Sequence, residues 1–125
     1  MTRINCIPVQ ELTDKHLLAE YYELPRVFTL AKKAYERGDI KNIPPAYTLG
    51  KGHVRFFYDK IGYLYDRFGD LGIELTKRGF NIDEYKFIVA QGKAYDCPFE
   101  ICNDWTPTAE AMQINRERIK ERLGK

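Results

Sequence analysis

The chain has 125 residues, a mass of 14.7 kDa and 44% hydrophobic residues, values typical of one folded domain spanning residues 1–125. The apolar content excludes a chain that is disordered over most of its length. Twenty lysines and arginines against 18 acidic residues leave a net charge of +2, which excludes a protein held on nucleic acid by net charge alone.

The sequence contains no segment suited to a membrane. No apolar run approaches the roughly 18 residues that a membrane span needs, and the charged N-terminal region lacks the apolar stretch of a signal peptide. We therefore expect a cytoplasmic protein without a membrane partner.

The three cysteines, Cys6, Cys97 and Cys102, cannot all pair with one another. Their spacing relative to His16 or His53 fits no common zinc-binding pattern. We expect buried, unpaired thiols, and neither a metal nor a structural disulfide.

The first predicted element is a long amphipathic helix that begins at Thr13 and Asp14 and ends before Gly38. Its core face is the series of apolar residues at three- and four-residue steps, namely Leu17, Tyr21, Leu24, Phe28, Ala31 and Tyr35. Pro25 removes one helical donor, so we expect a kink near Tyr21.

The opposite side of this helix is expected to be a polar stripe of His16, Ala19, Glu20, Glu23 and Arg26 that faces away from the core. By spacing alone, a solvated face with weak helical ion pairs is the favoured interpretation. A second interpretation gives Glu23 a role in acid–base chemistry, because the neighbouring proline kink can partly bury its carboxylate.

Glycines and prolines predict a loop over residues 38–53. A turn that presents backbone donors to a phosphate is one reading of its last residues, 48–53, but an ordinary turn is favoured because the spacing of a phosphate-binding loop is absent.

The second predicted helix runs over residues 54–78 and ends at Gly79. Its core series is Val54, Phe57, Ile61, Leu64, Phe68, Leu71 and Leu75. Base-stacking and packing roles are both open to Tyr58, Tyr63 and Tyr65, and the packing role is favoured.

Residues 80–104 show mixed signals and are expected to be mostly irregular. A third helix is predicted to start with Thr106 as its cap and Pro107 in its first turn. Its core residues are expected to be Ala111, Met112, Ile119 and Leu123. Arg118 and Arg122 are expected on its outward side, one turn apart.

Four segments together resemble one known family. They are MTRIN (1–5), DKHLLAEYYELPRVF (14–28), LGKGHVRFFYDK (49–60) and KRGFNI (77–82). In this order they resemble the endonuclease V family of the T-even phages, whose members are pyrimidine-dimer DNA glycosylases and abasic-site lyases. The third predicted helix resembles the family more weakly.

The resemblance implies an all-α fold: a single compact domain of three main helices with the N-terminal segment threaded between them. It also implies that damaged double-stranded DNA is the substrate, that no cofactor or metal takes part, and that the protein acts as a monomer.

In this family the nucleophile is the α-amino group exposed when the initiator methionine is removed, which corresponds to Thr2 here. An α-amine has a pKa of about 7.7–8.0 against about 10.4 for lysine, so far more of it is neutral at pH 7. The family's amine attacks the anomeric carbon of the sugar and leaves an imine, from which β-elimination cuts the strand. The carboxylate that assists this chemistry corresponds to Glu23.

The DNA contacts of the family correspond to Arg3, His16 and Arg26 and, through the weaker similarity of the third helix, to Arg118 and Arg122. Such cationic contacts position the duplex and make binding sensitive to salt. Tyr22 stands where the family commonly has an arginine, so we expect a stacking or hydroxyl contact with DNA at this position.

A different function is compatible with the same residues. Tyr22 replaces a charged contact, and the printed sequence stops at Lys125, before the tyrosine-rich region that contacts the lesion in the phage enzymes. The alternatives are a DNA-kinking binding module, or an abasic-site lyase that has lost specificity for pyrimidine dimers.

Overall fold

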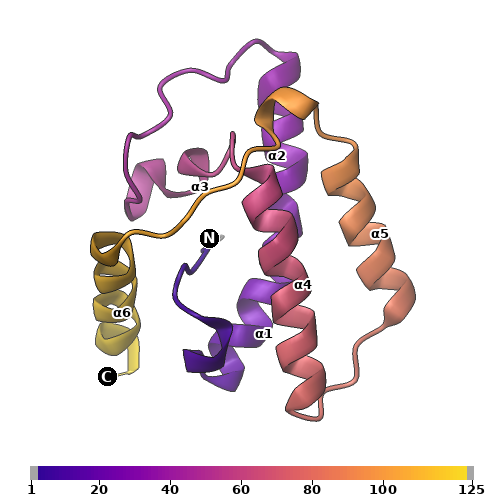
Figure 1. Cartoon of the computed structure of the whole chain (residues 1–125), viewed down its shortest axis with the longest axis vertical. Helices are drawn as coiled ribbons and strands as arrows, with labels where there is room; N and C mark the ends of the chain where they lie inside the picture. The colour runs from indigo at the N-terminus through magenta and orange to yellow at the C-terminus, as the bar shows by residue number, and fades with distance from the viewer. Residues whose placement is uncertain (1–2, 124–125) are drawn as a thin grey trace.

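The computed structural model of the chain describes residues 3–123, which form helices joined by turns and loops (Figure 1). Apart from an isolated bridge between Lys60 and Cys102, these residues contain no β-structure, which confirms the all-α prediction. The α-helices are α1 (Asp14–Glu23), α2 (Pro25–Glu36), α3 (His53–Phe56), α4 (Ile61–Lys77), α5 (Glu84–Tyr95) and α6 (Ala109–Leu123). The 3₁₀ turns are η1 (Val9–Glu11), η2 (Gly50–Gly52) and η3 (Phe99–Ile101). In the described part of the chain, no helix is long and apolar enough to cross a bilayer.

The core is built around α4, which runs through the middle of the view with α5 on one side and α6 on the other (Figure 1). Helix α4 packs on α1 and α5, and α2 packs on α5. The predicted apolar series of both long segments is buried, except that Tyr35 and Val54 are half-buried. Tyr58, Tyr63 and Tyr65 are half-buried and packed against the core, which agrees with the favoured packing role.

The first predicted helix is two helices, because the helix is interrupted at Leu24, between α1 and α2. Pro25 is the first residue of α2 and has no N–H to continue the ladder. The Val27 amide instead donates to the Leu24 carbonyl in a tighter turn, at 3.0 Å. Pro25 therefore disturbs the helix as predicted, but the result is an interruption at Leu24 and not a kink near Tyr21.

The second predicted helix is also interrupted, since α3 ends at Phe56 and α4 begins at Ile61. Phe56 and Phe57 are both buried, at 2% and 0% exposure. Adjacent side chains on a helix point about 100° apart, so a turn after Phe56 lets both rings enter the core. The predicted end holds: Gly79 has φ +89°, and the Phe80 amide donates to the Leu75 carbonyl at 3.0 Å.

Helix α5 contradicts the prediction that residues 80–104 are mostly irregular. The Asp83 side chain caps it by accepting a hydrogen bond from the Lys86 amide at 3.0 Å. Phe87 anchors it by stacking on Phe68, with the ring centroids 5.0 Å apart. Gly72 of α4 makes this approach possible, because a Cβ there would lie 3.0 Å from the Phe87 ring.

Helix α6 begins later than predicted. Thr108, rather than Thr106, accepts the capping hydrogen bond, from the Ala111 amide at 3.0 Å. Ala111 is buried as expected, but Leu123 is 56% exposed and does not reach the core. The buried polar residue of this helix is Asn115, at 2% exposure.

Candidate functional site

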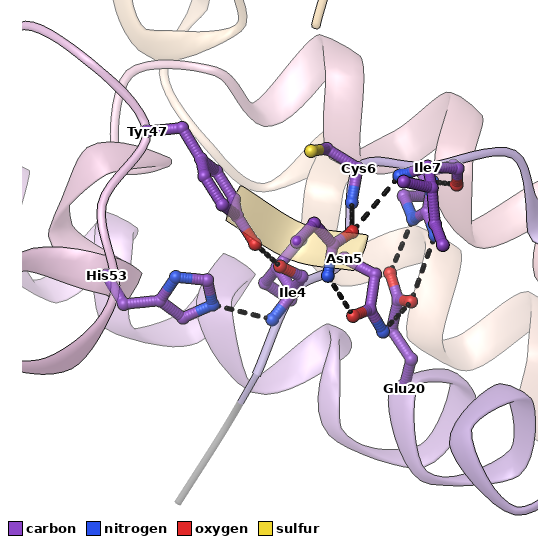
Figure 2. A network of polar contacts seen from close by, with 9 residues as sticks. Ile4, Asn5, Cys6, Ile7, Glu20, Tyr47 and His53 are labelled. Carbon is purple, nitrogen blue, oxygen red and sulfur yellow. Dashed lines mark hydrogen bonds and ion pairs between the residues drawn. The ribbon is translucent and has the colours of Figure 1, made fainter. Parts of the chain in front are cut away.

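The candidate site is organised by the N-terminal segment, residues 3–7, which is held through hydrogen bonds to side chains from other parts of the fold (Figure 2). Asn115 of α6 accepts from the Cys6 and Ile7 amides at 2.7 and 3.2 Å. Arg67 of α4 donates to the Ile7 carbonyl at 2.8 Å. Thr2, the predicted nucleophile, lies outside the described residues.

Glu20 is not on a solvated stripe, as the helical spacing suggested, but is buried at 1% exposure. Its carboxylate pairs with the guanidinium of Arg67, whose Nε and Nη2 donate to the two carboxylate oxygens. Asn5 also donates to Glu20, at 2.8 Å. Charges removed from water need such partners, so the pair ties α1 and α4 to the N-terminal segment.

Tyr22, Glu23 and Arg26 surround the break between α1 and α2. Glu23 is the last residue of α1 and is half-buried, whereas Arg26 is exposed near the start of α2. Tyr22 is 68% exposed, with its ring edge-on to that of Tyr21 at 5.3 Å between centroids. A carboxylate, a cation and an accessible aromatic ring are thus presented along a short stretch of chain.

His16 of α1 and Arg122 of α6 lie close enough to interact electrostatically. His16 is half-buried, and its Nδ1 lies 3.2 Å from the Thr13 hydroxyl oxygen. Burial lowers the pKa of His16, and the positive charges of Lys15 and Arg122 lower it further. His16 and Arg122 are both predicted DNA contacts, and the lowered pKa makes His16 less readily protonated than a free imidazole.

Arg3 and Arg118 border the same small cavity, of about 20 Å³, which Ile4, His53 and Asn115 also line. Both arginines are half-buried. The cavity lies where the N-terminal segment meets α6, so these two predicted contacts are also brought together.

The arginines divide into two groups by whether a carboxylate holds them. Ion pairs with carboxylates hold Arg37, Arg55, Arg67, Arg78 and Arg116. Within residues 3–123, no carboxylate pairs with Arg3, Arg26, Arg118 or Arg122. The second group consists of the arginines that the family resemblance assigned to DNA. An arginine without a carboxylate partner can bind a phosphate without first giving up an ion pair.

The thiols are buried or half-buried, as predicted, and Cys6 and Cys97 are the buried ones. Burial raises the pKa of Cys6 to about 12 and that of Cys97 to about 11, so both remain protonated and unreactive at neutral pH. No group of three or more His, Cys, Asp and Glu side chains within residues 3–123 is arranged to hold a metal ion.

Four further side chains hold the N-terminal segment without having been predicted from the sequence to do so: Tyr47, His53, Arg67 and Asn115. One signal was present: Arg67 lies three residues after Leu64 and four before Leu71, within the apolar stripe of α4. A charged residue at such a position requires a buried partner. Nothing local to Asn115 indicates its long-range contacts.

The model of the family described as pyrimidine dimer DNA glycosylase matches residues 1–87 of the chain. This range contains the N-terminal segment, α1, α2 and α4, whereas α5 is only partly included and α6 lies beyond it.

Proposed function

The chain belongs to the pyrimidine dimer DNA glycosylase family, a family of DNA repair enzymes, and we propose that it excises pyrimidine dimers and cuts the resulting abasic site. In this proposal the enzyme is a monomer that needs no metal or cofactor, the nucleophile is the α-amine of Thr2 after removal of Met1, and Glu23 is the assisting carboxylate. Both activities proceed through one imine on that amine.

The proposed reaction begins when the neutral amine attacks C1′ of the damaged nucleotide. The C1′–N bond breaks, and its electron pair leaves with the base, which takes up a proton. The C1′–O4′ bond then breaks and O4′ takes up a proton, while the nitrogen, which loses both of its protons over these steps, forms the imine with C1′. Removal of a C2′ proton expels the O3′ phosphate by β-elimination, and Glu23 is the proposed acceptor of that proton.

The observation that carries the proposal is the division of the arginines. The family resemblance and the ion-pair pattern independently select Arg3, Arg26, Arg118 and Arg122. These side chains, with His16, are the proposed phosphate contacts. They come from the N-terminal segment and from α1, α2 and α6.

We further propose that the N-terminal segment is threaded between the main helices, which would carry the amine to the DNA-facing side. The support is its hydrogen bonding: Asn5 bonds to Glu20 of α1, Ile7 to Arg67 of α4, and Cys6 to Asn115 of α6. These hydrogen bonds to three helices fix the position of residues 5–7.

Borohydride trapping tests the proposed chemistry, because borohydride reduces an imine to a stable amine. We expect a covalent protein–DNA adduct on a duplex with one thymine dimer, in the presence of EDTA, after intact mass has confirmed removal of Met1. Residues 2–11 contain no lysine, so an adduct on the peptide that ends at Glu11 identifies the α-amine. An adduct on a lysine-containing peptide instead contradicts the assignment of Thr2.

Glu23→Gln separates binding from chemistry. This variant should bind the dimer duplex like the wild type but fail to cut the strand. Lys33→Gln of α2, which carries an exposed charge outside the proposed site, is the control and should cut normally. Full cutting by Glu23→Gln would remove Glu23 from the mechanism.

A second function is favoured by Tyr22, whose exposed ring stands where the family commonly has an arginine. It is a duplex-kinking module or an abasic-site lyase without specificity for dimers. Trapping on an abasic duplex but not on the dimer duplex indicates the lyase. Salt-dependent binding with no trapping on either duplex indicates the binding module.

A further inference from the structure

Both backbone polar groups of Ile4 are held by side chains from the segment that ends in α3 (Figure 2). The Ile4 amide donates to Nε2 of His53 at 2.8 Å, and the Tyr47 hydroxyl donates to the Ile4 carbonyl at 3.0 Å. Ile4 itself is 1% exposed. The backbone at this residue is therefore fixed in position and in orientation.

The acceptor on His53 is itself fixed by a second hydrogen bond. Nδ1 of His53 lies 2.9 Å from the Thr48 carbonyl, which can only accept, so Nδ1 carries the proton and Nε2 presents its lone pair to Ile4. The imidazole is buried at 4% exposure and meets the rings of Tyr47 and Phe57 edge-on, with centroids 5.5 and 5.8 Å away. Packing and hydrogen bonding thus select one tautomer and one ring orientation.

We propose that His53, assisted by Tyr47, is a positioning residue for the N-terminal amine; this inference rests on the function proposed above. Two residues of extended chain span at most about 7 Å, so a fixed Ile4 limits the volume that an amine on residue 2 can explore. Attack on C1′ needs the amine near its target, and a misplacement of about 1 Å can slow such a step by about a hundredfold. His53 and Tyr47 therefore contribute to catalysis by holding Ile4 in place.

The test measures rate and binding separately in the full-length protein. The rate is that of borohydride trapping on an abasic duplex, with the protein in excess and saturating, and the affinity for the same duplex is measured by fluorescence anisotropy. The variants are His53→Leu, which removes the acceptor, and His53→Gln, whose side-chain carbonyl can accept from Ile4 while its amide donates to Thr48. Tyr65→Phe is the matched control, because it loses one hydroxyl contact, which joins α4 to Tyr95 of α5 and does not involve the N-terminal segment.

We expect His53→Leu to trap about ten- to a hundredfold more slowly than the wild type, with an affinity for DNA within about twofold. His53→Gln should recover much of the rate, Tyr47→Phe should slow trapping to a smaller degree, and Tyr65→Phe should match the wild type. Trapping by His53→Leu at the wild-type rate, or a loss of affinity equal to its loss of rate, would overturn the inference.

Hydrogen exchange of the Ile4 amide gives a readout that is independent of activity. It should be slow in the wild type and in His53→Gln, and fast in His53→Leu, while core amides of α4 stay protected in all of them. If the wild type shows this protection but traps on neither the dimer duplex nor the abasic duplex, the proposed function fails while the hydrogen bond between Ile4 and His53 stands. Equal protection of Ile4 in His53→Leu would refute the positioning role directly.

Discussion

Replacing Glu20 with glutamine would leave the buried guanidinium of Arg67 without its counter-charge. The two side chains are 0% and 7% exposed, so water cannot take the place of the carboxylate. Removing one partner of such a pair costs about 3–5 kcal/mol, because the remaining charge stays buried. The glutamine amide would also place a donor where Arg67 needs an acceptor. In a domain with about 5–15 kcal/mol of stability, this loss is large.

Urea unfolding followed by far-UV circular dichroism measures this cost as a lower midpoint at an unchanged slope. Glu23→Gln is the control, since it removes a half-buried carboxylate of the same helix and should change stability by less than about 0.5 kcal/mol. The double variant Glu20→Gln/Arg67→Met should be more stable than Glu20→Gln alone, because it no longer buries an unpaired charge. A loss of stability in Glu20→Gln no larger than that in Glu23→Gln would show that buried Arg67 does not need its counter-charge.

Three further predictions concern DNA binding, pH and backbone strain. Arg26→Ala or Arg122→Ala should each reduce the slope of log affinity against log salt by about 0.9. Arg37 pairs with Asp39, so Arg37→Ala should leave the slope unchanged. Equal slopes in all three variants would contradict the division of the arginines. Burial lowers the pKa of His53 below 6.5, so the imidazole binds a proton more readily in the unfolded chain than in the folded one. The free energy of unfolding should therefore fall as the pH drops below 6.5, by at most about 1.4 kcal/mol per pH unit. Unfolding at pH 5 to 7 should therefore show a weaker pH dependence in His53→Gln than in the wild type, and identical profiles would argue against a neutral buried imidazole. Gly79→Ala should lower the melting temperature through a strain of about 1–2 kcal/mol at φ +89°, while Gly69→Ala inside α4 should raise it by relieving about 0.5–1 kcal/mol; shifts of the same sign would refute this account.

Helix α4 was predictable because its apolar positions recur at three- and four-residue steps and are buried on one side. Helix α5 was not, because its apolar residues point both ways: Phe87 packs on the core, while Ile88 and Val89 are 59% and 46% exposed. The capping residue Asp83 was the one local sign of this helix. Periodicity also could not reveal the turn between α3 and α4, since a count of apolar positions does not register that Phe56 and Phe57 are adjacent.

The candidate site was only partly accessible from the sequence. The arginines came from resemblance, and their lack of carboxylate partners became visible only in three dimensions. Glu20 was assigned to the wrong face, although it lies three residues after Leu17 and four before Leu24, within the apolar series of α1. Its partner Arg67 is 47 residues away, and no local pattern joins two such positions.

The hydrogen bonds of the N-terminal segment also set the order in which the molecule can be completed during synthesis. Ile4 needs a partner 49 residues later, and Cys6 needs one 109 residues later. Ile4 and Cys6 leave the ribosome early but form these hydrogen bonds late, because contacts of such sequence separation cannot form until the later part of the chain has been synthesised. During that interval the start of the chain is open to processing enzymes, so the proposed removal of Met1 can precede the contact of helix α6 with the segment.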